Sequence, residues 1–167
     1  MPEISSLLQA AIDYDSGDLL RIHHLLKVHG LARLIAQREG LDDHTRFITE
    51  AAAAVHDIGI HVCEEKFGCS GGKLQEQEGP AVARRLLESL GFSPLDTDRI
   101  CFLVGHHHTY AGVDGPDWQI LLEADFLVNL YEDGLSRDAG EAAGERMFRT
   151  ETGKALLRSM LPKAESS

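Results

Sequence analysis

The stretch Glu50-Ala51-Ala52-Ala53-Ala54-Val55-His56-Asp57-Ile58-Gly59 decides the fold, because it joins a tightly packing helix to two adjacent polar side chains. Four alanines and a valine form a narrow helical surface that can approach other helices closely. A carboxylate buried there without a cationic partner costs roughly several kcal/mol. A divalent metal ion satisfies both His56 and Asp57, since neutral imidazole and ionised carboxylate are good ligands. Adjacent helical residues point about 100° apart, so the other ligands must come from different helices.

Apolar residues recur at helical spacing through most of the chain, and no segment alternates convincingly as a strand does. Asp18 and Ser93 stand where helix N-caps are expected, and Pro94 suits a first helical position. The regular part of the helix that contains Pro80 is expected to begin near Gly79. The expected helices cover residues 4–14, 18–39, 42–59, 74–90, 93–104 and 116–132, with one or two short helices up to residue 161. The sequence therefore predicts an all-α chain.

Potential metal ligands stand on four of these helices, each beside apolar neighbours. His24 lies on the apolar face of the second helix, and Asp125 lies among leucines, an alanine and a valine on the sixth. His106 and His107 end the fifth helix. Each alone has an ordinary explanation, such as a hydrogen-bonded core histidine, a capping aspartate or a surface histidine. Together, the order His, His-Asp, His-His, Asp along an all-α chain indicates a metal site.

Five motifs in this order resemble the HD superfamily of metal-dependent phosphohydrolases, over about residues 21–133. The motifs are Arg21-Ile-His-His24-Leu-Leu-Lys-Val28, Ala54-Val-His56-Asp57-Ile58-Gly59, Gly79-Pro-Ala81 before a helix, Leu103-Val-Gly-His106-His107 and Glu123-Ala-Asp125. The resemblance implies a single-domain helical bundle with a metal ion at the helix crossing. The implied ligands are His24, His56, Asp57 and Asp125. His23 and His29 compete with His24, but only His24 has valine four and alanine eight residues later, as the family does.

The chain departs from the family pattern at two positions. Many members carry lysine or glutamate three residues beyond the signature aspartate, where this chain has Ile60. Members with two metals usually have a histidine where this chain has Gln75. A second ion would therefore depend on Asp57 as a bridge with His106 and His107, helped by Glu76 or Glu78. We expect one tight site, with these two histidines otherwise hydrogen-bonding to phosphate or water.

The resemblance implies hydrolysis of a small phosphoester, a nucleotide-like phosphomonoester or phosphodiester, by metal-activated water. Asp57 is the expected ligand that orients the water or accepts its proton. Arg21 lies one turn before His24 on the same helical face, so with His107 it could stabilise phosphoryl charge. His106 and Lys73, at the end of a glycine-rich loop, are further candidates for substrate binding. The ion could be Mn, Fe, Co, Ni or Zn.

The amino-acid composition of the chain indicates which kinds of binding partner it is expected to have. The chain has 167 residues, 43% of them hydrophobic, with a net charge of −11, which suits a globular domain and disfavours nucleic-acid binding. Three cysteines without a Cys-x-x-Cys spacing argue against a disulfide framework. We expect a cytoplasmic protein without a signal peptide or membrane span, acting on a small phosphorylated metabolite or nucleotide. The oligomeric state stays open.

The expected organisation is an HD domain over residues 18–134. Residues 1–17 form an N-terminal helix, and residues 135–167 a helical extension, both packed on that domain. Two alternatives to the phosphohydrolase remain: an HD-fold di-iron oxygenase, against which Gln75 weighs, and a non-catalytic metal-containing regulatory or ligand-binding domain, which Ile60 keeps open.

Overall fold

The computed structural model describes residues 2–164, and in this part of the chain it contains nine helices and no strand, which confirms the all-α prediction. The helices are α1 (Ile4–Tyr14), α2 (Leu19–Arg38), α3 (Asp43–Val55), α4 (Ile60–Phe67), α5 (Gly72–Ser89), α6 (Pro94–Val104), α7 (Pro116–Glu132), α8 (Arg137–Met147) and α9 (Glu151–Met160). No helix in the described residues is long and apolar enough to cross a membrane.

Side-chain caps begin the helices that carry the candidate site. The Asp18 carboxylate accepts a hydrogen bond from the Arg21 backbone N–H at 3.2 Å at the start of α2. Ser93 caps α6 in the same way, with Pro94 in the first turn, as predicted. Each cap satisfies a backbone donor that the helix leaves unpaired.

Three local features differ from the expectation. The helix with the alanine run ends at Val55 rather than Gly59, so His56 caps α3 and Asp57 follows in a turn. A short helix, α4, fills part of the segment that no pattern had assigned. Helix α5 begins at Gly72 and continues through Pro80, which has no N–H to donate to the Glu76 carbonyl.

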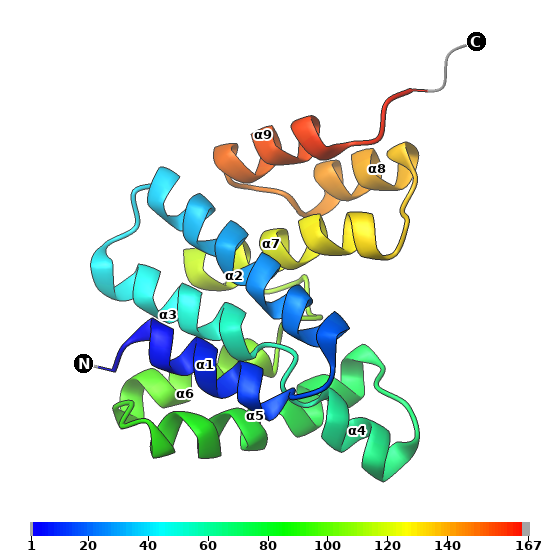
Figure 1. The fold of residues 1–167 in the computed structure, drawn as a ribbon. Coiled ribbons are helices and arrows are strands. Elements are labelled where there is room, and N and C mark those ends of the chain that lie inside the picture. The colour runs from blue at the N-terminus through cyan, green and yellow to red at the C-terminus, as the bar shows by residue number, and fades with distance from the viewer. Residues whose placement is uncertain (1, 165–167) are drawn as a thin grey trace.

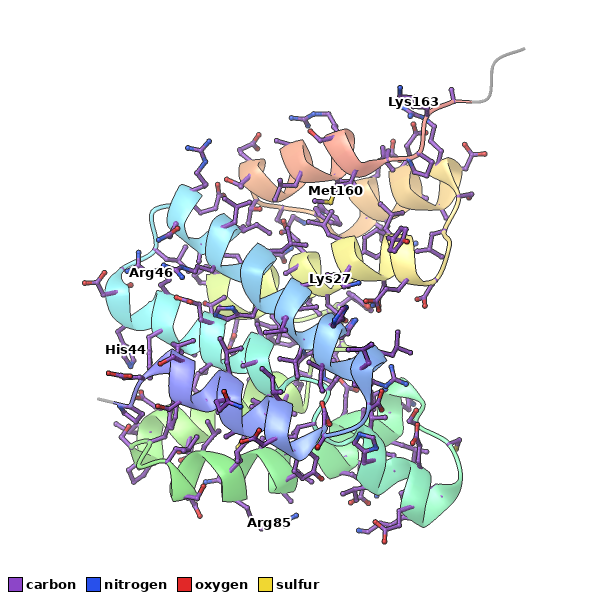
Figure 2. The ribbon with its side chains drawn as sticks, in the orientation of Figure 1. Lys27, His44, Arg46, Arg85, Met160 and Lys163 are labelled. Atoms are coloured by element: carbon purple, nitrogen blue, oxygen red, sulfur yellow. The ribbon has the colours of Figure 1, made fainter. Side chains whose placement is uncertain are left out.

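Helices α2, α3 and α7 pack against one another at the centre of the molecule (Figure 1). Helices α4, α5 and α6 lie at one end of this group, and α8 and α9 cover the other end beside α7. The alanines Ala51, Ala52 and Ala53 are fully buried, so α3 has neighbours on most of its surface. Charged side chains such as Arg46, Arg85 and Lys163 point outward (Figure 2).

A close contact between two glycines fixes the turn after α3. A Cβ atom on Gly59 would lie 2.7 Å from the Cα of Gly79, a distance that real structures do not tolerate. Gly59 therefore lets this turn touch the backbone of α5 directly. The contact holds His56 and Asp57 at the crossing of the helices.

Candidate metal centre

Four side chains from three parts of the fold meet around the rings of His24 and His56. The His24 Nε2 atom lies 3.1 Å from His56 Nε2, Asp57 Oδ2 and Asp125 Oδ1. The His56 Nε2 atom lies 3.4 Å from the same two carboxylate oxygens. These are the four metal ligands that the resemblance implies, and the structure brings them together from α2, the turn after α3, and α7.

Hydrogen bonds at Nδ1 fix the tautomers of His24 and His56. His56 Nδ1 lies 2.7 Å from the Ala53 carbonyl oxygen, which can only accept, so Nδ1 carries the proton. His24 Nδ1 lies 2.8 Å from Glu132 Oε2 and donates to that carboxylate. In a neutral imidazole the opposite nitrogen, Nε2, then carries a lone pair. Both lone pairs point at the carboxylates, an arrangement typical of histidines that ligate metal ions.

The donor set fits one divalent ion. Asp125 Oδ1 is buried and has no hydrogen-bond donor among the described residues. Lone pairs and carboxylate oxygens repel one another unless a proton or a cation lies between them. Donors about 2.1 Å from one ion are about 3.0 Å apart at right angles and about 3.4 Å apart at tetrahedral angles. The separations from His24 and His56 lie in this range. The donor atoms of His24, His56 and Asp57 all lie within 4.8 Å of one another, so these three could hold a transition metal, and Asp125 Oδ1 adds a fourth donor beside the two histidines.

The electrostatics of the cluster favour bound positive charge. Burial lowers the pKa of His24, but its contacts with Asp125 and Asp57 outweigh burial and raise the pKa to about 11. Burial likewise opposes protonation of His56, and the same carboxylates still raise its pKa. Burial raises the pKa of Asp57, but the His56 and His107 imidazoles reverse this and hold the pKa well below its usual value. A divalent ion would supply this charge in place of protons.

A second cluster shares Asp57 with the first. The other oxygen of Asp57, Oδ1, lies 3.2 Å from His107 Nε2, and His108 offers a third donor atom within 4.8 Å of the other two. His107 Nδ1 donates to the Val104 carbonyl at 2.6 Å, so its Nε2 also faces the cluster. Gln75 Oε1 lies 3.2 Å from Nε2 of both His107 and His108. Asp57 thus has one oxygen at each cluster.

The expectation for His106 is corrected by this geometry. Its Nδ1 atom donates to the Phe102 carbonyl at 2.7 Å, and its ring stacks on Phe102 with centroids 4.0 Å apart. The second cluster contains His108 instead. Residues 105–108 form a turn, in which successive side chains point in different directions. His107 therefore points at Asp57, whereas His106 points at Phe102.

The residues that line the cavity beside the metal cluster show which of the expected substrate-binding side chains can reach it. Its volume is about 250 Å³, and Arg21 lines it, whereas Lys73 does not. Glu76 instead accepts hydrogen bonds from the His108 backbone and the Thr109 hydroxyl. Glu78 forms an ion pair with Lys66 at 3.0 Å. These two glutamates are therefore engaged away from the second cluster.

A family model described as the HD domain matches residues 21–143. The chain belongs to the HD-domain family. A solved structure with the same fold is described as a predicted HD superfamily hydrolase from an uncultured Thermotogales bacterium. It is 24% identical in sequence, with a TM-score of 0.68 over 95% of this chain and 85% of that one. No curated protein matches the chain by sequence. The boundaries expected for the HD domain, 18–134, stay a prediction.

Two residues of this HD-domain site, Asn129 and Glu132, were not identified from the sequence, and the place of His108 in the second cluster was not predicted. Asn129 and Glu132 follow Asp125 by four and seven residues on α7, so they lie on the same helical face, and both line the cavity. That spacing is the signal that could have found them. Nothing in the local pattern around His108 distinguishes it from His106, because the direction of each depends on how the turn packs.

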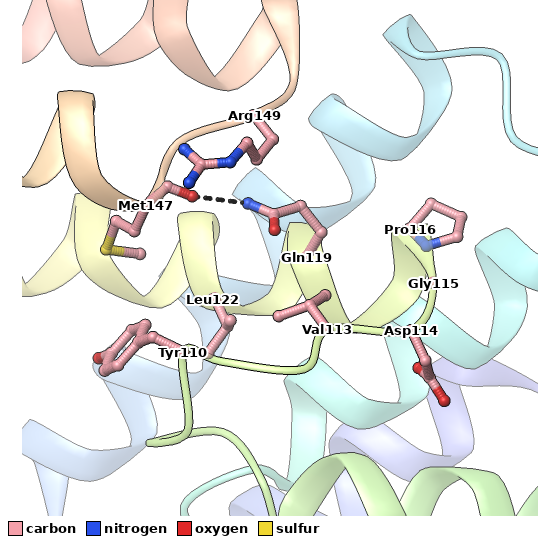
Figure 3. A pocket seen from close by; sticks show the side chains of 9 residues that line it. All are labelled: Tyr110, Val113, Asp114, Gly115, Pro116, Gln119, Leu122, Met147 and Arg149. Carbon is pink, nitrogen blue, oxygen red and sulfur yellow. Dashed lines mark hydrogen bonds between the residues drawn. The ribbon is translucent and has the colours of Figure 1, made fainter.

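A second cavity of this HD domain has a different character. It measures about 450 Å³ and lies beside α7, below the segment that joins α8 to α9 (Figure 3). Its one carboxylate among the lining residues, Asp114, pairs with Arg99 at 2.7 Å, and no histidine or cysteine lines it. Gln119 donates to the Met147 carbonyl across one wall. This cavity has no set of metal-type donors, so the candidate site is the smaller one.

Proposed function

We propose that this chain is a metal-dependent phosphohydrolase that hydrolyses a small phosphoester, either a nucleotide-like phosphomonoester or a phosphodiester. Membership of the HD-domain family supports a metal-dependent hydrolase. The observation that carries the proposal is that Asp57 and Asp125 both contact the Nε2 atoms of His24 and His56, while a buried oxygen of Asp125 has no hydrogen-bond partner among the described residues. Such a donor set needs a cation, and a cation next to an open cavity can act on a bound anion.

These four residues would hold the ion, which when bound supplies Lewis-acid activation of water and of a phosphoryl oxygen. A divalent Mn, Fe, Co, Ni or Zn ion suits two imidazoles and two carboxylates. His24 and His56 would bind through Nε2, because Glu132 and the Ala53 carbonyl hold their Nδ1 protons.

Asp57 is proposed to orient the attacking water and to accept its proton. Its side chain is 17% exposed, whereas that of His24 is 4% exposed, so Asp57 is the ligand with better access to the cavity. With Oδ2 directed at His24 and His56, Oδ1 remains on the side of His107. The aspartate can therefore contact the ion with one oxygen and a water with the other.

Arg21 is proposed to neutralise charge on the phosphoryl group, and His107 is proposed to position Asp57. The cavity wall also carries Glu132 and Asp133, so an entering phosphate needs a cationic side chain. Arg21 is the arginine on this wall, and its planar guanidinium suits bidentate contact with phosphoryl oxygens. His107 is fully buried and does not line this cavity, so it is proposed to act through Asp57, whose Oδ1 lies 3.2 Å from its Nε2 atom.

The second cluster could bind a second ion more weakly, and a di-iron oxygenase is therefore the alternative function. Asp57, His107 and His108 provide three donors, and Gln75 adds only an amide oxygen. Because a neutral amide binds hard and borderline cations less strongly than a carboxylate or imidazole, we propose one tight site. Two tightly bound irons with oxygen consumption would instead favour a di-iron oxygenase.

The test is a panel of phosphoesters on protein reconstituted separately with each candidate metal and with Mg. We expect turnover with at least one ion, and loss of both metal and turnover in Asp57→Ala. The matched control is Asp114→Ala, which removes an aspartate from the other cavity and should keep both properties. Unchanged activity in Asp57→Ala would refute the mechanism. No turnover with any ion would favour a non-catalytic domain.

A further inference from the structure

The cavity at the metal cluster is too small for a whole substrate. Its volume of about 250 Å³ lies below the lower limit of about 300 Å³ that is usual for small-molecule sites. An ion, its water and a phosphoryl group would take up most of this space. The rest of any larger phosphoester must therefore extend beyond it.

A neighbouring cavity shares two wall residues with the first. This neighbour measures about 610 Å³ and is lined by Leu19, Leu20, His23, Lys27, Tyr131 and Glu132. Leu20 and Glu132 line both cavities, so the two are adjacent across these side chains. The neighbour lies where α2 faces the C-terminal end of α7, and Lys27 marks this position in Figure 2. A phosphoester bound at the metal cluster would reach it by passing over Leu20 and Glu132.

The walls of the neighbouring cavity suit a planar, largely apolar group. Leu19 is 66% exposed, Leu20 is 59% exposed and Tyr131 is 85% exposed, which is unusual for side chains of this size on one surface. The Lys27 Nζ atom lies 5.8 Å from the centre of the Tyr131 ring. The same Nζ is held 2.6 Å from Glu132 Oε1, so its charge is already paired. This surface offers stacking rather than a further anion site.

Glu132 connects the two cavities physically. One of its oxygens accepts from His24 Nδ1 at 2.8 Å, and the other binds Lys27 at 2.6 Å beside Tyr131. A carboxylate held from both sides is a fixed partition, so a substrate must pass over Leu20 and Glu132 to reach from one cavity to the other. The path starts at the candidate metal ligands and ends at the tyrosine.

We propose that the leaving group of the phosphoester lies in the Leu20–Tyr131 cavity and that these two side chains select leaving groups with a planar ring, such as a nucleoside. This inference rests on the proposed function and adds specificity residues to it. Leu20 and Tyr131 bind the ring, while the phosphoryl group stays on the metal side of Glu132.

The experiment compares AMP with glycerol phosphate, a phosphomonoester without a ring. In Tyr131→Ala and Leu20→Ser the KM for AMP should rise about tenfold, as expected for a lost base-stacking contact. Because the contact is remote from the reacting bond, kcat should change less than about twofold. The KM for glycerol phosphate should not change in Tyr131→Ala. Leu20 also lines the cavity at the metal cluster, so the comparison with glycerol phosphate is made on Tyr131→Ala alone. Both side chains are exposed, so the variants should fold normally.

Matched controls are Tyr14→Ala and Leu34→Ser, which remove an exposed tyrosine and an exposed α2 leucine outside both cavities. Neither should alter any KM. Adenosine binding, followed by saturation-transfer NMR, tests the cavity without phosphoryl chemistry and should weaken in Tyr131→Ala. An AMP KM that is unaffected by Tyr131→Ala and Leu20→Ser would overturn the inference and leave the phosphohydrolase intact. Tyr131-dependent adenosine binding without any phosphoester turnover would contradict the proposed function but support the cavity assignment.

Discussion

Two buried carboxylates on α7, Glu123 and Asp125, are only two residues apart and have opposite surroundings. Glu123 is fully buried and accepts hydrogen bonds from the Gln119 side chain at 2.6 Å, the Thr150 hydroxyl at 2.6 Å, and the backbone N–H groups of Arg149 and Thr150. Asp125 faces the Nε2 atoms of His24 and His56, and its Oδ1 has no donor in the described part of the chain.

The hydrogen-bond donors around a buried carboxylate show whether it has a structural role or binds an ion. Glu123 is stabilised by neutral donors from Gln119 on α7 and from the residues just before α9, so its charge needs no ion. Asp125 meets groups that are acceptors when neutral, so its charge does need one. Residues two positions apart on a helix, such as Glu123 and Asp125, point about 200° away from each other. They therefore reach different environments although they are close in sequence.

The largest expected effect comes from removing the ion-binding carboxylate. In Asp125→Ala, turnover of the best phosphoester should fall by about a thousandfold or more, because a bound ion contributes several kcal/mol of transition-state stabilisation. Steady-state kinetics on metal-reconstituted protein check this. Glu123→Gln is the matched control and should keep most of the turnover. Similar losses in both variants would break the comparison.

Removing the structural carboxylate should act on stability instead. Glu123→Ala leaves four part-buried donors without this acceptor, so the free energy of unfolding should fall by about 3 kcal/mol. Urea unfolding measures this, and the metal content per folded chain should stay unchanged. Glu141→Ala removes an exposed glutamate paired with Arg137 and should cost less than about 0.5 kcal/mol. Equal costs in the two variants would contradict the structural role of Glu123.

A third carboxylate on α7, Glu132, sharpens the comparison, because it acts on the ion through His24. Glu132→Gln should weaken metal affinity about 10- to 100-fold, as the loss of a charged partner makes the imidazole a poorer ligand. Metal titration with a competing chelator measures the shift. Lys27→Met keeps the Glu132–His24 contact and should change affinity less. Unaltered affinity in Glu132→Gln would remove Glu132 from the account.

The smallest effect concerns a buried histidine–carboxylate contact away from the cluster. His29 Nε2 lies 3.0 Å from Glu50 Oε1, and burial lowers the pKa of His29 from 6.5 although Glu50 opposes this shift. The unfolded chain therefore binds the proton more readily, so stability is full above pH 6.5 and falls as pH drops towards the folded-state pKa. One such group contributes a slope of at most about 1.4 kcal/mol per pH unit.

The variant His29→Gln keeps a donor for Glu50 but cannot titrate, so the unfolding free energy should depend less on pH below 6.5. Urea unfolding of both proteins across this range gives the difference. His44→Gln, which removes an exposed histidine from its contact with Asp96, serves as the control. A steeper pH dependence in His29→Gln would reverse the sign of this prediction.

Sequence reasoning reached the helical class from local patterns, and it reached the four residues that meet at the site from the resemblance to the HD superfamily. Apolar spacing, caps and prolines predict helices, and a polar side chain among apolar neighbours marks a buried charge. Asp18 and Ser93 act as caps where expected. The role of the four residues as metal ligands stays a prediction, supported by their geometry.

The remaining features depend on contacts between distant segments. Helix α3 ends four residues earlier than expected because the turn packs on α5 through Gly59 and Gly79, which no local pattern records. The choice of His108 over His106 depends on that packing as well. Glu132 could be placed on the face of Asp125 by helical spacing, but its contact with His24 needed the position of α2.

The most direct test is the metal content of the wild-type protein after loading with Mn, Fe, Co, Ni or Zn and exhaustive desalting, measured by inductively coupled plasma mass spectrometry. The account predicts about one tightly held ion per chain for at least one of these metals, and almost none in Asp125→Ala. A wild-type chain that retains no ion under any loading condition, or an Asp125→Ala chain that retains as much as the wild type, would contradict it.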